Sequence, residues 1–193
     1  MSTKLRDLIR NVRSCKTAAE ERAVIQKEKA AIRESFLANE NEYRPRNVAK
    51  LLFIQMMGHD TEFGQMDCLK LITASSFTEK RIGYLGLTQL FSEKSEVLMM
   101  ATNRIRIDLN NSSNYIVALA LMALSEICTT EMCRELASEV LKLLTSGTSY
   151  IKKKAALACT RVITKVPEKI EDFAEKCELL MEDRHHGVLV GTL

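Results

Sequence analysis

Small residues recur at a nearly constant interval from residue 83 to residue 191 of this chain, each inside an apolar stretch. They are Gly83, Ala118, Ala155 and Gly191, and their separations are 35, 37 and 36 residues. Two helices and two short loops occupy about that length, and stacked helical hairpins need a small residue where their backbones approach closely. The interval therefore predicts an all-α fold, a right-handed α-solenoid of HEAT/armadillo-like helical hairpins.

Two other helical architectures compete with this prediction. Tetratricopeptide repeats have a similar length, but their Trp-Leu-Gly-Tyr pattern is missing from this sequence. A helical bundle without repeats is the second alternative. The chain contains only two prolines and seven glycines in 193 residues, which suits long helices of any arrangement.

The positions of the helices follow from apolar periodicity and from end signals. Leu5, Leu8 and Val12 share one face of a first helix. A capping box, Thr17-Ala-Ala-Glu20, begins a second helix that reaches about Leu37. The polar stretch 39–45 is predicted to be a loop because it ends in a proline. Further helices are expected near residues 46–57, 63–75, 78–91, 95–109, 113–128, 130–146, 149–165, 167–182 and from about 186.

Composition indicates a soluble, folded protein with free thiols. Apolar residues make up 46% and charged residues 27%, which excludes general disorder. The longest apolar run, Tyr115 to Leu124, is about half the length of a bilayer span. The six cysteines form no C-x-x-C pair and no secretory signal precedes them, so we expect buried thiols in a reducing cytosol.

Motifs that support catalysis are missing from the sequence. It contains no phosphate-binding loop, no dinucleotide-binding glycine motif and no serine-hydrolase elbow. The three histidines and the cysteines show no metal-ligand spacing, and only the His185-His186 pair beside two acids hints at a surface metal contact. A run of three lysines, 152–154, is interpreted as a solvated helix surface, because nucleic-acid binding usually adds aromatic stacking residues or a larger charge surplus, and the sequence has no Trp and a net charge of only +3. We therefore expect no enzyme activity, cofactor, metal or nucleic acid.

Positive charge is concentrated in the first 50 residues. They carry 12 Lys and Arg against 7 Asp and Glu, whereas the other 143 carry 16 against 18. Arg44, Arg46 and Lys50 gather around one expected helix start, where backbone N–H groups can also hold a phosphate. Arg10 and Arg13 share a face of the first helix and can meet an acidic peptide or a partner subunit. The alternative for all these cations is an ordinary solvated helix surface.

Six segments of the sequence carry a family resemblance: 46–54, 64–72, 78–86, 106–110, 152–157 and 186–189. These segments resemble the large adaptin subunits of clathrin adaptor complexes. The resemblance extends from about Leu5 to the C-terminus, and the residues around Thr17 and Arg22 are most similar to the gamma branch, which serves the trans-Golgi network and endosomes. The plasma-membrane alpha branch is the near alternative, and a generic HEAT-repeat scaffold is the more distant one.

The resemblance implies a subunit of a heterotetrameric coat complex. Residues 1–193 would then be the N-terminal part of an adaptin trunk, with helices in 1–58 contacting a sigma small subunit and HEAT-like repeats in 59–193, the last one incomplete. The chain ends inside a helix, so we expect a longer protein. The implied partners are sigma, a beta-type adaptin, a mu subunit, an Arf-family GTPase, phosphoinositide membranes, dileucine cargo signals and, indirectly, clathrin.

The same resemblance implies roles for individual residues. Arg13 is similar to the family's arginine that receives the acidic residue of dileucine signals. Arg44, Arg46 and Lys50 are similar to the phosphoinositide-binding cluster, although Pro45 and Asn47 replace a lysine and a tyrosine of the alpha branch. This departure favours a singly phosphorylated inositide. The residues expected to contact an Arf GTPase are Met66, Leu69 and Met100, for which core packing is the alternative.

Overall fold

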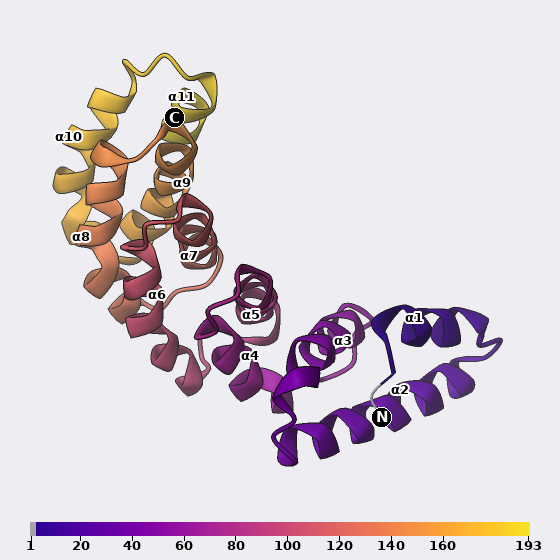
Figure 1. Cartoon of the computed structure of the whole chain (residues 1–193). Helices are drawn as coiled ribbons and strands as arrows, with labels where there is room; N and C mark the ends of the chain where they lie inside the picture. Colours follow the sequence, from indigo (N-terminus) through magenta and orange to yellow (C-terminus); the bar gives the residue numbers. More distant parts are fainter. Residues whose placement is uncertain (1–2) are drawn as a thin grey trace. The chain divides into compact units, whose positions relative to one another are not determined.

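The computed structural model describes residues 3–193, and it confirms the all-α prediction. Helices account for all regular structure in this range, and none of these residues lies in a strand (Figure 1). The chain divides into two compact units, the first ending at Phe91 and the second comprising Ser92–Leu193. Each unit is described separately below. Within residues 3–193, no helix is long and apolar enough to cross a membrane.

The first unit contains five α-helices and two short 3-10 turns. The N-terminal pair α1 and α2 packs against α3, and α4 forms a tight hairpin with α5. The hairpin needs glycine, because a Cβ atom on Gly83 would lie 2.7 Å from the backbone nitrogen of Ile72. The bounds are α1 Leu5–Ser14, α2 Ala18–Leu37, α3 Arg44–Met56, α4 Gln65–Ile72 and α5 Phe77–Leu90, with 3-10 turns at Asn41–Tyr43 and Glu62–Gly64.

The second unit contains six α-helices arranged in two layers. One layer consists of α6, α8 and α10, and the other of α7, α9 and α11; each helix contacts the next member of its own layer. The bounds are α6 Thr102–Leu109, α7 Asn114–Glu126, α8 Thr130–Ser146, α9 Ser149–Lys165, α10 Ile170–Leu180 and α11 His186–Thr192, with 3-10 turns at Glu96–Ala101 and Pro167–Lys169.

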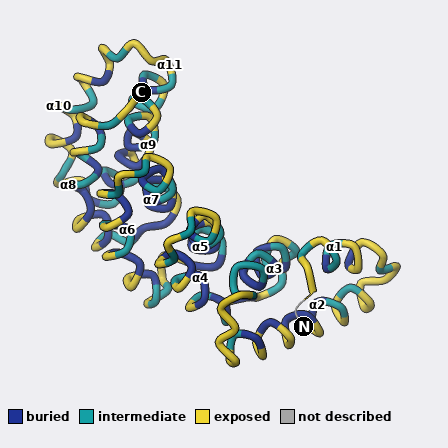
Figure 2. The backbone as a smooth tube through the Cα atoms, viewed as in Figure 1, coloured by how far each residue is buried: buried dark blue, intermediate teal, exposed yellow. Residues whose placement is uncertain are grey.

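Small residues occur where helices of the second unit approach closely, as the repeat interval predicts. Ala118 on α7 and Ala155 on α9 are buried. A Cβ atom on Gly191 of α11 would lie 3.2 Å from the carbonyl oxygen of Lys153 on α9. Buried and exposed positions alternate along each helix with the helical period, so each helix turns one apolar stripe to the core (Figure 2).

The ends of the helices agree with the sequence signals in most places. The Thr17 hydroxyl accepts a hydrogen bond from the Glu20 backbone N–H at 3.2 Å, which caps α2 as the capping box predicts. Gly58 follows α3 with a φ of +84°, a conformation that glycine adopts without strain. The prediction that all of residues 39–45 form a loop is wrong, because α3 begins at Arg44. Pro45 lies in the first turn of α3, where its missing N–H costs nothing.

Candidate functional site

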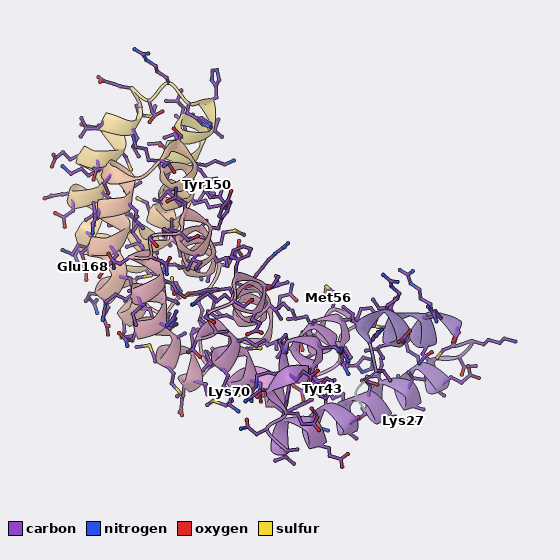
Figure 3. The ribbon with its side chains drawn as sticks, in the orientation of Figure 1. Lys27, Tyr43, Met56, Lys70, Tyr150 and Glu168 are labelled. Carbon is purple, nitrogen blue, oxygen red and sulfur yellow. The ribbon has the colours of Figure 1, made fainter. Side chains whose placement is uncertain are left out.

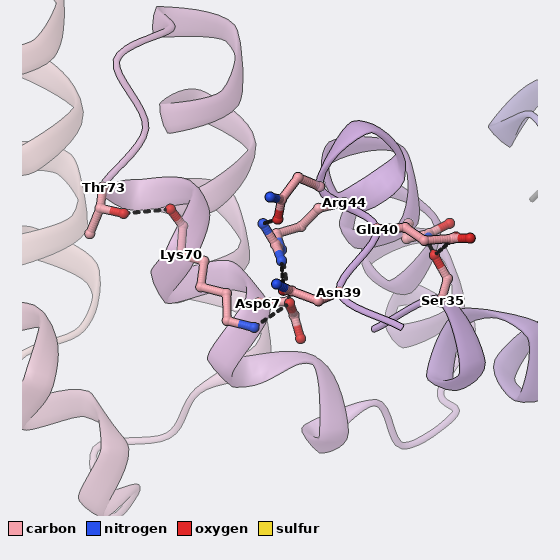
Figure 4. A network of polar contacts seen from close by, with 9 residues as sticks. Ser35, Asn39, Glu40, Arg44, Asp67, Lys70 and Thr73 are labelled. Atoms are coloured by element: carbon pink, nitrogen blue, oxygen red, sulfur yellow. Dashed lines mark hydrogen bonds and ion pairs between the residues drawn. The ribbon is translucent and has the colours of Figure 1, made fainter. Parts of the chain in front are cut away.

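The basic cluster begins with Arg44 at the start of α3, and this side chain is held inside a polar network. Its Nε atom donates to Asp67 Oδ1 on α4 at 2.9 Å (Figure 4). Other guanidinium nitrogens donate to the side-chain oxygens of Asn39 and Asn41. Only 11% of the Arg44 side chain is exposed, so its charge is largely satisfied within the protein. Arg44 therefore connects the start of α3 to α4 and to the preceding loop.

Lys50 lies in the protein interior, which corrects its predicted role as a head-group ligand. Its side chain is fully buried and its ammonium group forms an ion pair with Glu28 on α2. The same carboxylate accepts a hydrogen bond from the Thr3 hydroxyl at 2.9 Å. A buried charge must be paired to be tolerated, and Glu28 supplies that pairing. A head group outside the protein has no direct access to this ammonium.

Asn47, one of the two departures from the alpha branch, is also an interior residue. Its side-chain amide donates to the Ser35 hydroxyl at 2.9 Å, and Ser35 donates to Glu40 at 2.6 Å. This chain of hydrogen bonds attaches the segment after α2 to α3. Asn47 thus helps to hold the start of α3 in place, and its side chain is not exposed to solvent.

Two cations near the start of α3, Arg46 and Lys70, are accessible to solvent. Arg46 is partly exposed, and its guanidinium carbon lies 5.3 Å from the centre of the Tyr43 ring. Lys70 on α4 shares Asp67 with Arg44, at an Nζ–Oδ1 distance of 3.2 Å, and its side chain is 46% exposed (Figure 3). The sequence argument missed Lys70 because it belongs to another helix. The structure thus brings Arg44 and Lys70 together at Asp67 and places Lys50 elsewhere.

The remaining predicted residues occupy separate places. Arg13 is exposed in the last turn of α1, and Arg10 one turn earlier lies 3.7 Å from Asp7. Met66 is exposed on α4 and Leu69 beside it is half-buried. Met100 is exposed in the second unit, in the 3-10 turn before α6. None of these placements tests the partner predicted for the residue.

The second unit has an apolar and cationic surface that sequence reasoning did not identify. We call it the odd-helix face; it consists of the exposed sides of α7, α9 and α11. Tyr150 of α9 lies on this face (Figure 3). Its ring lies 6.4 Å from that of Tyr115 of α7, and Lys154 Nζ lies 5.6 Å from the centre of the Tyr150 ring. Burial, and then the charge of Lys153, lower the pKa of Lys154. The other large exposed residues of this face are Met122, Leu157 and Val190.

The odd-helix face carries almost no negative charge. The α9 and α11 segments contain no Asp or Glu, and α7 contains only Glu126. The spacing of seven residues between Tyr115 and Met122, and between Tyr150 and Leu157, is the sequence signal that would have revealed the stripe. Sequence alone assigns such residues to a core, because it does not show which side of the helix faces another helix.

The other layer of the second unit has a different surface. Its charged side chains pair between neighbouring helices: Arg106 of α6 with Glu135 of α8 at 2.8 Å, and Arg134 of α8 with Glu168 at 3.0 Å (Figure 3). Hydrogen bonds from the Glu168 backbone and from Arg134 lower the pKa of Glu168. Among residues 3–193, no group of three His, Cys, Asp or Glu side chains is arranged to hold a metal ion.

Comparison with known sequences identifies one protein family along nearly all of the chain. The family model for the adaptin N-terminal region matches residues 21–193. The chain is 54% identical over 188 residues to the AP-1 complex subunit gamma-2 of Arabidopsis thaliana, which covers 97% of the chain and 22% of that protein. It is 52% identical over 193 residues to the AP-1 complex subunit gamma of Dictyostelium discoideum, covering 100% of the chain and 22% of that protein. The chain thus spans less than a quarter of these relatives.

Comparison with solved structures supports the fold. A homology model of the full-length AP-3 complex in an intermediate open conformation matches 78% of the chain and 27% of its own chain, with a TM-score of 0.69 and 30% identity. A designed armadillo repeat protein matches 98% of the chain and 97% of its own, with a TM-score of 0.59 and 14% identity. The second likeness concerns the fold alone.

Proposed function

The chain belongs to the adaptin family, and from this membership we propose that it is the N-terminal part of the trunk of a gamma-type large subunit in a clathrin adaptor complex. The observation that carries the proposal is the identity of 52–54% to two AP-1 gamma subunits over 97–100% of the chain. Such a subunit acts by binding other molecules. Its work is vesicle-mediated protein transport at the trans-Golgi network and endosomes.

The proposed partners within the complex are a sigma small subunit, a beta-type adaptin and a mu subunit. We assign the sigma contact to helices within residues 1–58 and regard residues 59–193 as the HEAT-like repeats of the trunk. The odd-helix face supports a scaffolding role, because exposed aromatic side chains such as Tyr115 and Tyr150 are typical of protein interfaces. Clathrin would be recruited indirectly, through parts of the assembly other than these residues.

The proposed membrane contact uses a smaller cluster than the sequence predicts. We assign phosphoinositide contact to Arg46 and Lys70, with Arg44 holding Asp67 and the start of α3 in position. Two accessible cations suit one phosphate better than several. Arg13 remains the proposed contact for the acidic residue of dileucine cargo signals. Met66, Leu69 and Met100 remain proposed contacts for an Arf-family GTPase.

Co-expression with a sigma subunit tests the main proposal. We expect the two chains to purify as one complex of equal stoichiometry, whereas a sigma subunit expressed alone remains insoluble. A chain that stays monomeric while sigma remains insoluble contradicts the proposal. A parallel co-expression uses the sigma subunit of the plasma-membrane complex. Preference of the chain for this subunit would indicate the alpha branch instead of the gamma branch.

Liposome binding tests the membrane contact separately. The double substitution Arg46→Glu with Lys70→Glu should weaken binding to vesicles with a singly phosphorylated inositide by more than about tenfold, since each charge-assisted contact is worth about 1.5–3 kcal/mol. The matched control is Lys27→Glu with Lys94→Glu, which makes the same charge change at other exposed positions. Equal losses in both variants would indicate general electrostatic attraction and contradict a site at the start of α3.

A further inference from the structure

The junction between α7 and α8 brings two cysteine sulfur atoms into contact. Thr129 caps α8, its hydroxyl accepting a hydrogen bond from the Met132 backbone N–H at 3.2 Å. Cys128 precedes this cap and Cys133 lies on the first turn of the helix. These are the two positions at which a pair of apolar side chains often packs across a helix start. Here the pair consists of thiols, and their Sγ atoms are 2.9 Å apart.

Two cations of α9 lie near this pair. Arg161 and Lys165 lie close to Cys128, and both pair with Glu93 on their other side. The Nε atom of Arg161 is buried and has no hydrogen-bond partner among residues 3–193. A thiolate accepts a hydrogen bond more strongly than a neutral thiol, so the guanidinium favours the charged form of a neighbouring sulfur.

The two thiols differ in acidity. The hydrogen bond from the Cys133 thiol, and then the Arg161 and Lys165 charges, lower the pKa of Cys128. The same hydrogen bond, and then burial, raise the pKa of Cys133. Cys128, the sulfur that Arg161 and Lys165 approach, is therefore the more acidic of the two thiols. This division is the one found in dithiols that react with oxidants, where one sulfur attacks and the other resolves the product.

We propose that Cys128 and Cys133 are a redox-active dithiol that closes reversibly to a disulfide when the protein meets a hydroperoxide. The Cys128 thiolate attacks one peroxide oxygen and the O–O bond breaks, giving a sulfenic acid and, for hydrogen peroxide, water after protonation. The Cys133 sulfur then attacks the Cys128 sulfur, its proton leaves with the hydroxyl group as a second water, and the S–S bond forms. Two thiols are oxidised and one peroxide is reduced.

The peroxide reaches the pair through the non-helical residues between the two helices. Both sulfur atoms are buried in the folded chain. Residues 127–129 lie outside α7 and α8, so fewer backbone hydrogen bonds must open here than within either helix. A molecule as small as hydrogen peroxide needs only such a local opening.

A second thiol pair in the same unit provides an internal comparison. Cys159 on α9 and Cys177 on α10 have Sγ atoms 3.9 Å apart. Burial, and then the neighbouring Cys177, raise the pKa of Cys159. This pair is more exposed than the first, because Cys177 is only partly covered. Accessibility alone would thus favour oxidation of Cys159 and Cys177, whereas the shorter Sγ–Sγ distance and the neighbouring cations favour Cys128 and Cys133.

Peptide mapping after oxidation tests the proposal. The folded chain is treated with dilute hydrogen peroxide, free thiols are alkylated, and the chain is digested with trypsin. Cleavage after Arg106 and Arg134 releases a peptide, 107–134, that contains both Cys128 and Cys133 and no other cysteine. A disulfide between Cys159 and Cys177 would instead join peptides 155–161 and 177–184. Mass spectrometry therefore separates the two products without any substitution.

We expect peptide 107–134 to lose two hydrogens and to regain both alkylatable thiols after treatment with dithiothreitol. Its disulfide should form about tenfold or more faster than the cross-link between the other two peptides, because the thiolate is the reacting form. Cys133→Ser should stop the reaction at a Cys128 sulfenic acid that dimedone captures. If 107–134 keeps both thiols while 155–161 and 177–184 become joined, or if dimedone labels Cys133 and not Cys128 in the native chain, the proposal is overturned.

Discussion

The ion pair between Lys50 and Glu28 allows a test of whether the Lys50 side chain points into the protein or toward solvent. Replacing Lys50 with methionine keeps most of the length of the unbranched apolar side chain but removes the ammonium group that pairs with Glu28. Lys50 and Thr3 both donate hydrogen bonds to the Glu28 carboxylate in the original chain. In the variant only the Thr3 hydroxyl of these two would remain as a donor. Breaking a buried pair from one side costs about 3–5 kcal/mol.

The effect on thermal stability follows from the size of the first unit. One kcal/mol lowers the Tm of a domain of 60–100 residues by about 4–8 °C, so Lys50→Met should lower the Tm of this unit by at least about 12 °C. Urea unfolding followed by circular dichroism measures the free energy of unfolding. Amide hydrogen exchange in α2 and α3 shows whether the loss is located where the pair lies.

Two further variants separate loss of pairing from loss of a lysine. Lys27→Met makes the same substitution at an exposed position next to Glu28 and should change stability by about 0.5 kcal/mol or less. Lys50→Met combined with Glu28→Met replaces the pair by apolar side chains of similar size and should recover most of the stability. The reasoning fails if Lys50→Met is as mild as Lys27→Met, which would place the ammonium outside, or if the combined variant is no more stable than Lys50→Met alone.

Three other features give shorter predictions. Gly83→Ala should destabilise the first unit by about 1–3 kcal/mol in urea unfolding, because the new Cβ would meet the Ile72 backbone nitrogen at 2.7 Å. Thr17→Ala removes the cap of α2 and should cost about 0.5–2 kcal/mol in the same assay, with Thr17→Ser close to the original chain. The hydrogen bond from Lys165, and then the Arg161 charge, lower the pKa of Glu93 below its ordinary value of 4.5. The stabilisation by the Glu93 carboxylate is therefore fully present above pH 4.5 and is lost as the pH falls through the lowered pKa. The Tm of Glu93→Gln should consequently fall less steeply in acid than the Tm of the original chain.

The fold could be predicted from the sequence because its signals are local and repeated. A helix start such as Thr17-Ala-Ala-Glu20 needs only neighbouring residues to be recognised. The interval between Gly83, Ala118, Ala155 and Gly191 marks positions of close helix packing: an added Cβ atom would lie 2.7 Å from a backbone atom at Gly83 and 3.2 Å at Gly191, and both alanines are buried. The error at the start of α3 arose because proline ends helices in their interior but is favoured in their first turn. The helix expected over 95–109 is also shorter than predicted, because residues Glu96–Ala101 form a 3-10 turn before α6 begins at Thr102.

The basic cluster could be predicted only in part, because its geometry depends on residues distant in sequence. Arg46 and Lys50 share a helix face by spacing, and nothing local shows that this face turns toward α2. Glu28, 22 positions before Lys50, decides that the ammonium is buried. Asp67, 23 positions after Arg44, likewise decides that the guanidinium is held. Sequence spacing reports which residues lie together on one helix, whereas charge pairing between helices decides which of them face solvent.

The charges of the second unit show how the same principle supports a binding role. Arg106 and Arg134 each meet a carboxylate of a neighbouring helix, so these cations contribute to the packing of their own layer. Lys153 and Lys154 lie in the first turns of α9, where positive charge opposes the helix dipole, and neither forms an ion pair within residues 3–193. They therefore weaken the helix slightly and gain no ion pair from the described chain. Lys154 instead lies over the exposed Tyr150 ring, so cationic and aromatic side chains share one surface, a composition consistent with the scaffolding role proposed for the odd-helix face.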